Sequence, residues 1–149
     1  MQIGDYLLKE LVLPNLAASA KSEALAELIE PIRAQFPGID LNKAHQVLLE
    51  REQLGTTGIG DGVAIPHGKL VGLDKIILVV GRSRGGVRFE ALDSKPCTIF
   101  FLVLAPEQAA GMHLRILAHI SRLLKDEGFR RSFLGAQDRD ELFNLLKSV

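Results

Sequence analysis

The sequence predicts an α/β fold in which a small β-sheet has helices packed on its faces. Residues 76–80 and 98–104 are apolar runs, rich in β-branched or aromatic side chains and too short for helices, which is typical of buried strands. Residues 41–54 and 106–125 repeat apolar side chains at helical spacing. The chain has 149 residues without a repeat or a linker, so residues 1–149 are expected to form a single domain.

The N-terminal part is expected to form irregular structure and then a broken helix. Residues 2–18 predict a short helix or turn that leads to an edge strand. A helix follows, with Ser19 or Ser22 as its N-cap. Pro31 lies inside the helical pattern and cannot donate a backbone hydrogen bond, so we expect a kink or break near Glu27.

The next helix is predicted over residues 41–54. Asp40 precedes it as N-cap, and Gly55 follows it as a C-terminal glycine. Arg51 falls on the inward-facing stripe, where a guanidinium needs a partner. The apolar members of this stripe are Leu41, Ala44, Val47, Leu48 and Leu54.

A glycine-rich segment over residues 55–69 separates this helix from the first long strand. Ordering a glycine costs backbone entropy, so this density predicts a shaped loop instead of a regular element. Residues 63–65 then resemble a short strand, and His67 follows between Pro66 and Gly68. This arrangement predicts a rigid backbone at His67 and open space beside its imidazole ring. The four glycines within eight positions are Gly55, Gly58, Gly60 and Gly62.

The strands of the second half differ in their expected exposure. Residues 76–80 predict a buried strand, and residues 81–86, which include Arg82, predict a turn. Residues 87–89 alternate in the manner of an exposed edge strand. Residues 98–104 are the most apolar segment, and we expect them at the centre of the sheet.

The C-terminal part predicts three helices. Pro106 begins a helix that ends near Lys125, with His113 on its core side about two turns from the start. A short helix over residues 129–134 and a last helix capped by Asp138 follow. Two separate stripes divide the long helix: His113, Leu117, Ile120 and Leu124 on one side, and Arg115, His119 and Arg122 on the other.

Composition excludes several classes of partner. Lys and Arg together number 18, as do Asp and Glu, so no global field attracts nucleic acid or an anionic membrane. No run of about 18 apolar residues is present, and the N-terminus lacks a signal pattern, so membrane insertion is not expected and a cytoplasmic location is. The single cysteine, Cys97, is expected to be a buried structural thiol.

Nucleotide and metal chemistry do not match the motifs. Five residues separate Gly62 from Gly68, where a phosphate-binding loop has four, and Leu70 occupies the hydroxyl position. The four histidines show no ligand spacing and have no cysteine partner, so no metal and no cofactor is expected, although convergence in space leaves a metallohydrolase as a remote alternative.

Histidine nucleophilic chemistry remains. A neutral imidazole at His67 has a lone pair that can attack phosphorus, and the transfer needs mainly positioning and positive charge around the phosphate oxygens. Arg51 or His113 can supply charge, and backbone amides of the loop can supply donors. The spacing alone leaves a structural alternative for each of these three residues. His67 could be a loop histidine without function, Arg51 could form an inward salt bridge, and His113 could be a core histidine.

The segment from Thr57 to Lys69 closely resembles the active-site signature of enzyme IIA of the phosphoenolpyruvate-dependent phosphotransferase system, fructose/mannitol class. Glu50-Arg51-Glu52 and Met112-His113-Leu114 extend the resemblance over nearly the whole chain. The signature reads Thr57-Gly58-Ile59-Gly60-Asp61-Gly62-Val63-Ala64-Ile65-Pro66-His67-Gly68-Lys69.

The resemblance implies a phosphocarrier. His67 would accept a phosphoryl group from the phosphohistidine of the histidine-containing phosphocarrier protein, with His113 as a second active-site histidine and Arg51 as charge stabiliser. The phosphate-loop backbone would come from Thr57, Gly58 and Gly68. The family fold is a mixed sheet flanked by helices, and such a protein is a phosphoryl carrier more than a turnover enzyme.

Two branches of the family fit this chain. Gly68-Lys69-Leu70 resembles the nitrogen-regulatory branch, which acts on other proteins according to its phosphorylation state, whereas many fructose-type members carry alanine after the histidine. We therefore expect regulation. The alternatives are a sugar-transport component that passes the phosphoryl group to a IIB cysteine, and a binding module that is never phosphorylated.

Overall fold

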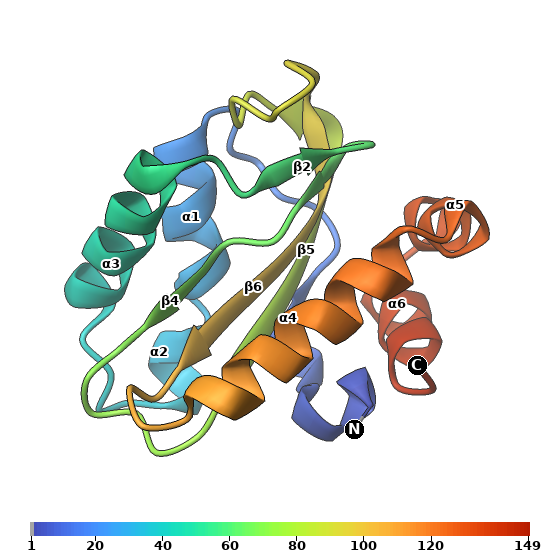
Figure 1. The fold of residues 1–149 in the computed structure, drawn as a ribbon. Helices are drawn as coiled ribbons and strands as arrows, with labels where there is room; N and C mark the ends of the chain where they lie inside the picture. Colours follow the sequence, from blue (N-terminus) through green and yellow to red (C-terminus); the bar gives the residue numbers. More distant parts are fainter. Residues whose placement is uncertain (1) are drawn as a thin grey trace.

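In the computed structural model, which describes residues 2–149, a mixed six-stranded sheet lies between two layers of helices (Figure 1). The central path of the sheet runs β1-β5-β6-β3-β2, and β4 also pairs with β6. The α/β fold class and the mixed sheet are therefore confirmed. The strands are β1 (Val12–Leu13), β2 (Gly58–Gly60), β3 (Val63–Ala64), β4 (His67–Lys69), β5 (Ile77–Val87) and β6 (Cys97–Ala105).

Strand β6 is the centre of the sheet, as its apolar sequence predicted. It pairs antiparallel with β5 on one side and parallel with β3 and β4 on the other. Strand β1 lies at the far edge, parallel to β5, which confirms the edge strand expected near the N-terminus. Because β6 is paired along both sides, the strand that follows the glycine segment is fixed against the most buried part of the molecule.

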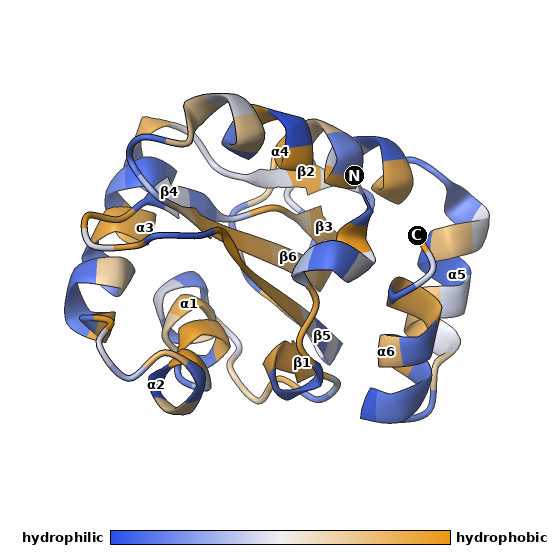
Figure 2. Ribbon diagram, turned by 90° about the horizontal axis from the view of Figure 1, so that it is seen from below, coloured by the Kyte–Doolittle hydropathy of each residue, from blue (hydrophilic) through white to orange (hydrophobic). Residues whose placement is uncertain are grey.

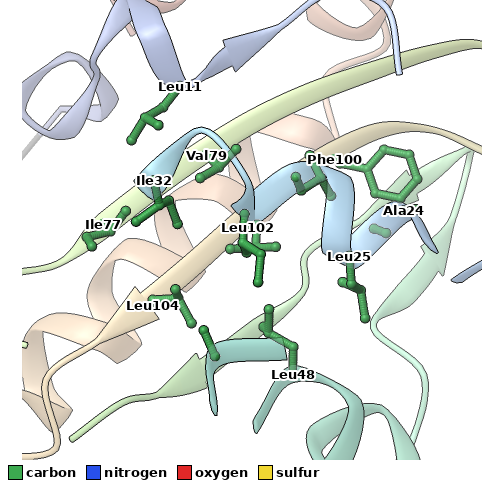
Figure 3. Close-up of a cluster of buried hydrophobic side chains, with 14 of the residues drawn as sticks. Leu11, Ala24, Leu25, Ile32, Leu48, Ile77, Val79, Phe100, Leu102 and Leu104 are labelled. Carbon is green, nitrogen blue, oxygen red and sulfur yellow. The ribbon is translucent and has the colours of Figure 1, made fainter. Parts of the chain in front are cut away.

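Helices cover both faces of the sheet, and the side chains of β6 alternate between the two cores. Phe100, Leu102 and Leu104 pack under α1 to α3 (Figure 3), whereas Phe101 and Val103 pack under α4 to α6. Figure 2 shows the hydrophobic strands between these layers. The helices are α1 (Lys21–Ile29), α2 (Ile32–Gln35), α3 (Leu41–Leu54), α4 (Ala110–Leu124), α5 (Glu127–Gly135) and α6 (Arg139–Leu146), preceded by the 3-10 turns η1 (Ile3–Tyr6) and η2 (Lys9–Leu11).

The first helix begins and breaks at positions other than those predicted. Ala20 is the N-cap of α1, so neither expected serine has that role. The break comes at Pro31 itself and not near Glu27, because the N–H of Glu30 still donates to the carbonyl of Ala26 and the helical bonds continue up to the proline.

Strand β5 continues through the segment predicted to be a turn. Arg82 is fully buried, and its guanidinium donates to the carbonyl oxygens of Pro14 (3.0 Å) and Phe133 (3.1 Å). These acceptors compensate a charge that the sequence pattern places in solvent. A separate edge strand at residues 87–89 was also wrong. Val87 is the buried last residue of β5 and pairs with Cys97, Arg88 makes an isolated bridge to Ala20, and Phe89 is buried.

The helices of the second layer fit the pattern more closely. Helix α4 begins at Ala110, four residues after Pro106, so His113 lies one turn from its start and not two. Asp138 caps α6 as predicted, by accepting from the N–H of Glu141. In the first layer, helix α3 also has the predicted bounds, with Asp40 as its N-cap.

Candidate functional site

His67 lies at the first position of β4, next to the central strand. It pairs with Val103 of β6, and the N–H of Val103 donates to the carbonyl of Pro66 at 2.9 Å. Figure 1 shows β4 between α3 and α4. Residues of both helices line one pocket together with His67. The rigid backbone predicted at His67 is thus that of a short strand in the sheet.

One ring nitrogen of His67 is committed to the backbone. Its Nδ1 lies 2.9 Å from the carbonyl oxygen of Ile65. A carbonyl oxygen can only accept, so Nδ1 carries the hydrogen and Nε2 retains a lone pair. Burial lowers the pKa of the half-buried ring, the bond to Ile65 opposes this, and the charge of Arg51 lowers the pKa further. The net lowering favours the neutral, nucleophilic form.

His113 stands beside His67. The two ring centroids are 5.6 Å apart and the ring planes meet at 74°. His113 is 6% exposed, and its Nε2 is buried without a hydrogen-bond partner among the described residues. Burial lowers the pKa of His113, and the nearby charges of His67 and Lys69 add to that effect. An unpartnered polar atom is costly unless a bound group engages it.

Arg51 reaches the same place from the last turn of α3. Its Nη1 donates to the carbonyl of Gly55 at 2.9 Å, which is the partner that its inward position required. None of the four ion pairs among residues 2–149 involves Arg51, so its charge is free to attract an anion. Leu54, expected on the buried stripe, is 85% exposed at the last position of α3.

These side chains line one pocket of about 700 Å³. Lys69 adds a second positive charge that sequence reasoning did not assign, although its place two residues after His67 on the same strand puts both side chains on one side. Exposed leucines form an apolar rim. The lining residues are Val47, Glu50, Arg51, Gln53, Leu54, His67, Gly68, Lys69, His113, Leu114 and Leu117.

Thr57 and Gly58 are not brought into this pocket. The N–H of Thr57 donates to Glu52 at 2.9 Å, and the N–H of Gly58 donates to Thr56 Oγ1 at 3.1 Å. Both amides are therefore occupied, although Gly68 does line the pocket. The segment is also more regular than expected, because Gly58–Gly60 forms β2.

Glu52 is a structural residue of the site that sequence reasoning missed. It is buried and accepts from both the N–H and the hydroxyl of Thr57, while Lys21 Nζ lies 3.1 Å from its Oε1. This network fixes the start of the glycine segment to the end of α3. Helical spacing contained the signal, since Glu52 follows Leu48 by four residues and shares its inward stripe.

Within residues 2–149 no three His, Cys, Asp or Glu side chains are grouped as metal ligands. No described helix is both long enough and apolar enough to cross a membrane. Cys97 is buried, as predicted, and burial raises the pKa of its thiol to about 11.

Comparisons with known proteins show the family to which the chain belongs. The family model described as "Phosphoenolpyruvate-dependent sugar phosphotransferase system, EIIA 2" matches residues 5–149. The chain is 40% identical over 146 residues to a nitrogen regulatory protein of Bradyrhizobium diazoefficiens, covering 98% of this chain and 95% of that protein. It is 31% identical over 146 residues to the fructose-specific EIIABC component of Bacillus subtilis, covering 98% of this chain but 23% of that one.

A solved structure extends the likeness to three dimensions. The crystal structure of nitrogen regulatory protein IIA-Ntr from Neisseria meningitidis superposes with a TM-score of 0.88 at 30% identity. The match covers 97% of this chain and 98% of that one.

Proposed function

Since the chain belongs to the EIIA 2 family of the phosphoenolpyruvate-dependent sugar phosphotransferase system, we propose that it is a phosphocarrier whose acceptor atom is Nε2 of His67. The donor would be the phosphohistidine of the histidine-containing phosphocarrier protein. The observation that carries the proposal is the hydrogen bond from Nδ1 to Ile65, since it leaves the lone pair on a nitrogen of a half-buried ring that lines a positively charged pocket.

The transfer is a displacement at phosphorus. The Nε2 lone pair forms the new N–P bond while the N–P bond of the donor breaks, and its electron pair returns to the donor imidazole. Nδ1 of His67 keeps its proton throughout. The carbonyl of Ile65 disperses the positive charge that the ring gains, so no general base is required.

Positive groups surround the position of the arriving phosphate. Arg51 and Lys69 offer charge-assisted hydrogen bonds to its oxygens. His113 offers a buried Nε2 that has no hydrogen-bond partner within residues 2–149, and protonation of this ring would become easier beside a bound dianion. Fixed charges around the equatorial oxygens are the main requirement of phosphoryl transfer.

The rim of the pocket suits a protein donor. Leu54 is 85% and Leu114 is 69% exposed, and both border the cavity that contains His67. Exposed apolar side chains around a polar centre are typical of the middle of a protein–protein interface. A carrier that docks there would exclude water from the reacting atoms.

The downstream role that we propose is regulation of the nitrogen type. The relatives from Bradyrhizobium diazoefficiens and Neisseria meningitidis are nitrogen regulatory proteins and match nearly their full length. Phosphorylation would place a dianion in a pocket that is positive when empty, and a partner can read that change. The fructose-specific relative favours a second candidate, transfer onward to a IIB cysteine.

The test is phosphorylation by phosphoenolpyruvate and the two upstream proteins, followed by mass spectrometry. The wild type should gain one phosphate that is labile in acid and stable in base, and His67→Ala should gain none. His45→Ala serves as the control, because His45 lies elsewhere on α3 and contacts the carbonyl of Ser22. A phosphate that persists on His67→Ala would contradict the assignment. Partner binding by a wild type that never accepts phosphate would favour a simple binding module.

A further inference from the structure

A second concave site lies on the other side of α4. It is a pocket of about 600 Å³ that shares no lining residue with the His67 pocket. Its residues come from the 3-10 turn η1 and from α4, which contact each other. The lining residues are Tyr6, Met112, Arg115, Ala118, His119 and Arg122.

The charges of this pocket are uncompensated. Arg115 and Arg122 both line it, and neither belongs to any of the four ion pairs among residues 2–149. No carboxylate is among the lining residues, although the whole chain has a net charge of zero. Positive charge is thus concentrated at one concave place, which attracts an anion locally.

Two further polar groups in the pocket lack strong partners. The Nε2 atom of His119 is buried without a hydrogen-bond partner among the described residues. Within the described part of the chain, the hydroxyl of Tyr6 donates to the sulfur of Met112 alone, at 3.2 Å, and a thioether is a weak acceptor. Buried polar atoms normally find partners, so the Nε2 atom of His119 indicates a bound group that is absent from the isolated chain, and the hydroxyl of Tyr6 is available to the same group.

We propose that this pocket binds a small phosphorylated metabolite, at a site separate from the pocket that contains His67. Two arginines match the oxygens of a phosphate ester or diphosphate, and His119 and Tyr6 complete the set of donors. Met112 and the ring of Tyr6 supply an apolar wall for the organic part. The volume lies within the range of small-molecule sites, whereas a nucleic acid or an acidic protein would need a longer positive surface than two arginines provide.

Helix α4 links the two pockets. Met112 and Arg115 line the new pocket, while His113 and Leu114, which lie between them in sequence, line the phosphocarrier pocket. A ligand that fixes α4 therefore bears on the position of His113. If the ligand changes the affinity for phosphate at His67, phosphate at His67 changes the affinity for the ligand by the same factor.

The test is an NMR titration of the full chain with inorganic pyrophosphate at constant ionic strength. We expect saturable shifts of the Tyr6 and His119 signals. Arg115→Gln/Arg122→Gln should weaken binding by at least about tenfold, since two charge-assisted contacts are lost. Shifts at Tyr6 and His119, and not at His67 and His113, separate this site from the proposed phosphocarrier pocket.

Matched variants keep the result interpretable. Arg88→Gln removes one exposed arginine elsewhere and should leave binding unchanged. Arg115→Lys/Arg122→Lys keeps the charges and should restore part of the affinity, and melting temperatures verify folding. Shifts confined to the His67 pocket, equal affinity in the glutamine double variant, or tighter binding of a glutamate-rich peptide than of pyrophosphate would overturn the proposal.

Discussion

The imidazole of His67 divides its two nitrogens between structure and chemistry. Nδ1 donates to Ile65 and sets the orientation of the ring, and Nε2 is left for phosphorus. Because burial and the charge of Arg51 both lower the pKa of this ring, it resists protonation that would destroy the lone pair. Orientation and reactivity thus come from the same few contacts.

Arg51→Ala is expected to slow phosphoryl acceptance much more than it destabilises the fold. The variant loses a positive group next to the transferred phosphate, which costs about 100-fold in rate. It also loses the hydrogen bond to the carbonyl of Gly55, which contributes about 1 kcal/mol. The initial rate of phosphorylation and urea unfolding measure the two effects separately.

Two variants of the same pocket are the controls. Gln53 lines the cavity but is uncharged, so Gln53→Ala should accept phosphate at a rate near that of the wild type. Arg51→Lys keeps the charge without the forked geometry and should be intermediate. If Arg51→Ala lost activity only in proportion to the unfolded fraction, Arg51 would be structural.

Gly68 fixes how closely α3 approaches β4. A Cβ at this position would lie 2.6 Å from Cγ1 of Val47. Valine is stiff at χ1, so the contact cannot be relieved by a simple rotation, and the helix that carries Arg51 would have to move. The glycine is therefore required by packing of the helix on the strand, and not by open space beside His67 as the sequence suggested.

Gly68→Ala is expected to reduce the free energy of unfolding by about 1–3 kcal/mol through overpacking, and to slow phosphorylation by displacing α3. Val47→Ala removes the clashing methyl group, so Gly68→Ala should cost little in that background. Urea unfolding of both single variants and the double variant gives the coupling energy. Strictly additive losses would show that the two residues do not compete for the same space.

Sequence periodicity predicted the helices and strands better than it predicted contacts between residues far apart in the sequence. Helix α3 was located to the residue because Asp40 and Gly55 mark its ends, and β6 was placed at the centre because it is apolar throughout. Arg82 could not be predicted, since its carbonyl acceptors are 51 or more residues away in sequence. Local patterns contain no information about such distant acceptors.

The same distinction applies to the candidate site. Helix phase indicated that Arg51 and His113 face inward, and the structure brings both to His67. Thr57 and Gly58 were expected at the phosphate, but the buried Glu52 occupies the amide of Thr57. That the residues 1–149 form a single domain, and that these side chains act in transfer, stay predictions.

At the scale of the whole molecule, the site joins the two helical layers across the sheet. Helix α3 contributes Arg51 from one layer, α4 contributes His113 from the other, and β4 holds His67 between them. The geometry of the pocket therefore depends on the integrity of both cores. Its histidines in turn link the pocket to the stability of the fold through their titration.

Global stability is expected to decrease as the pH falls below about 6.5. The pKa values of His67 and His113 are both lowered from 6.5, mainly by burial, so below that pH the unfolded chain binds more protons than the native one. The free energy of unfolding therefore rises with pH in this range. Urea unfolding at about pH 7.5 and about pH 5.5 measures the change.

His67→Gln/His113→Gln removes both groups and should show a smaller loss of stability between the two pH values. An equal loss in the wild type and the double variant would mean that other groups govern the dependence.

The most direct test of the central claim is to locate the phosphorus atom on the histidine ring. Protein that contains ¹⁵N-labelled histidine is phosphorylated, and phosphorus–nitrogen coupling is recorded by NMR. We predict coupling to Nε2 of His67, with Nδ1 still protonated and bonded to Ile65. Phosphorus on Nδ1 of His67, or on His113, would contradict the account.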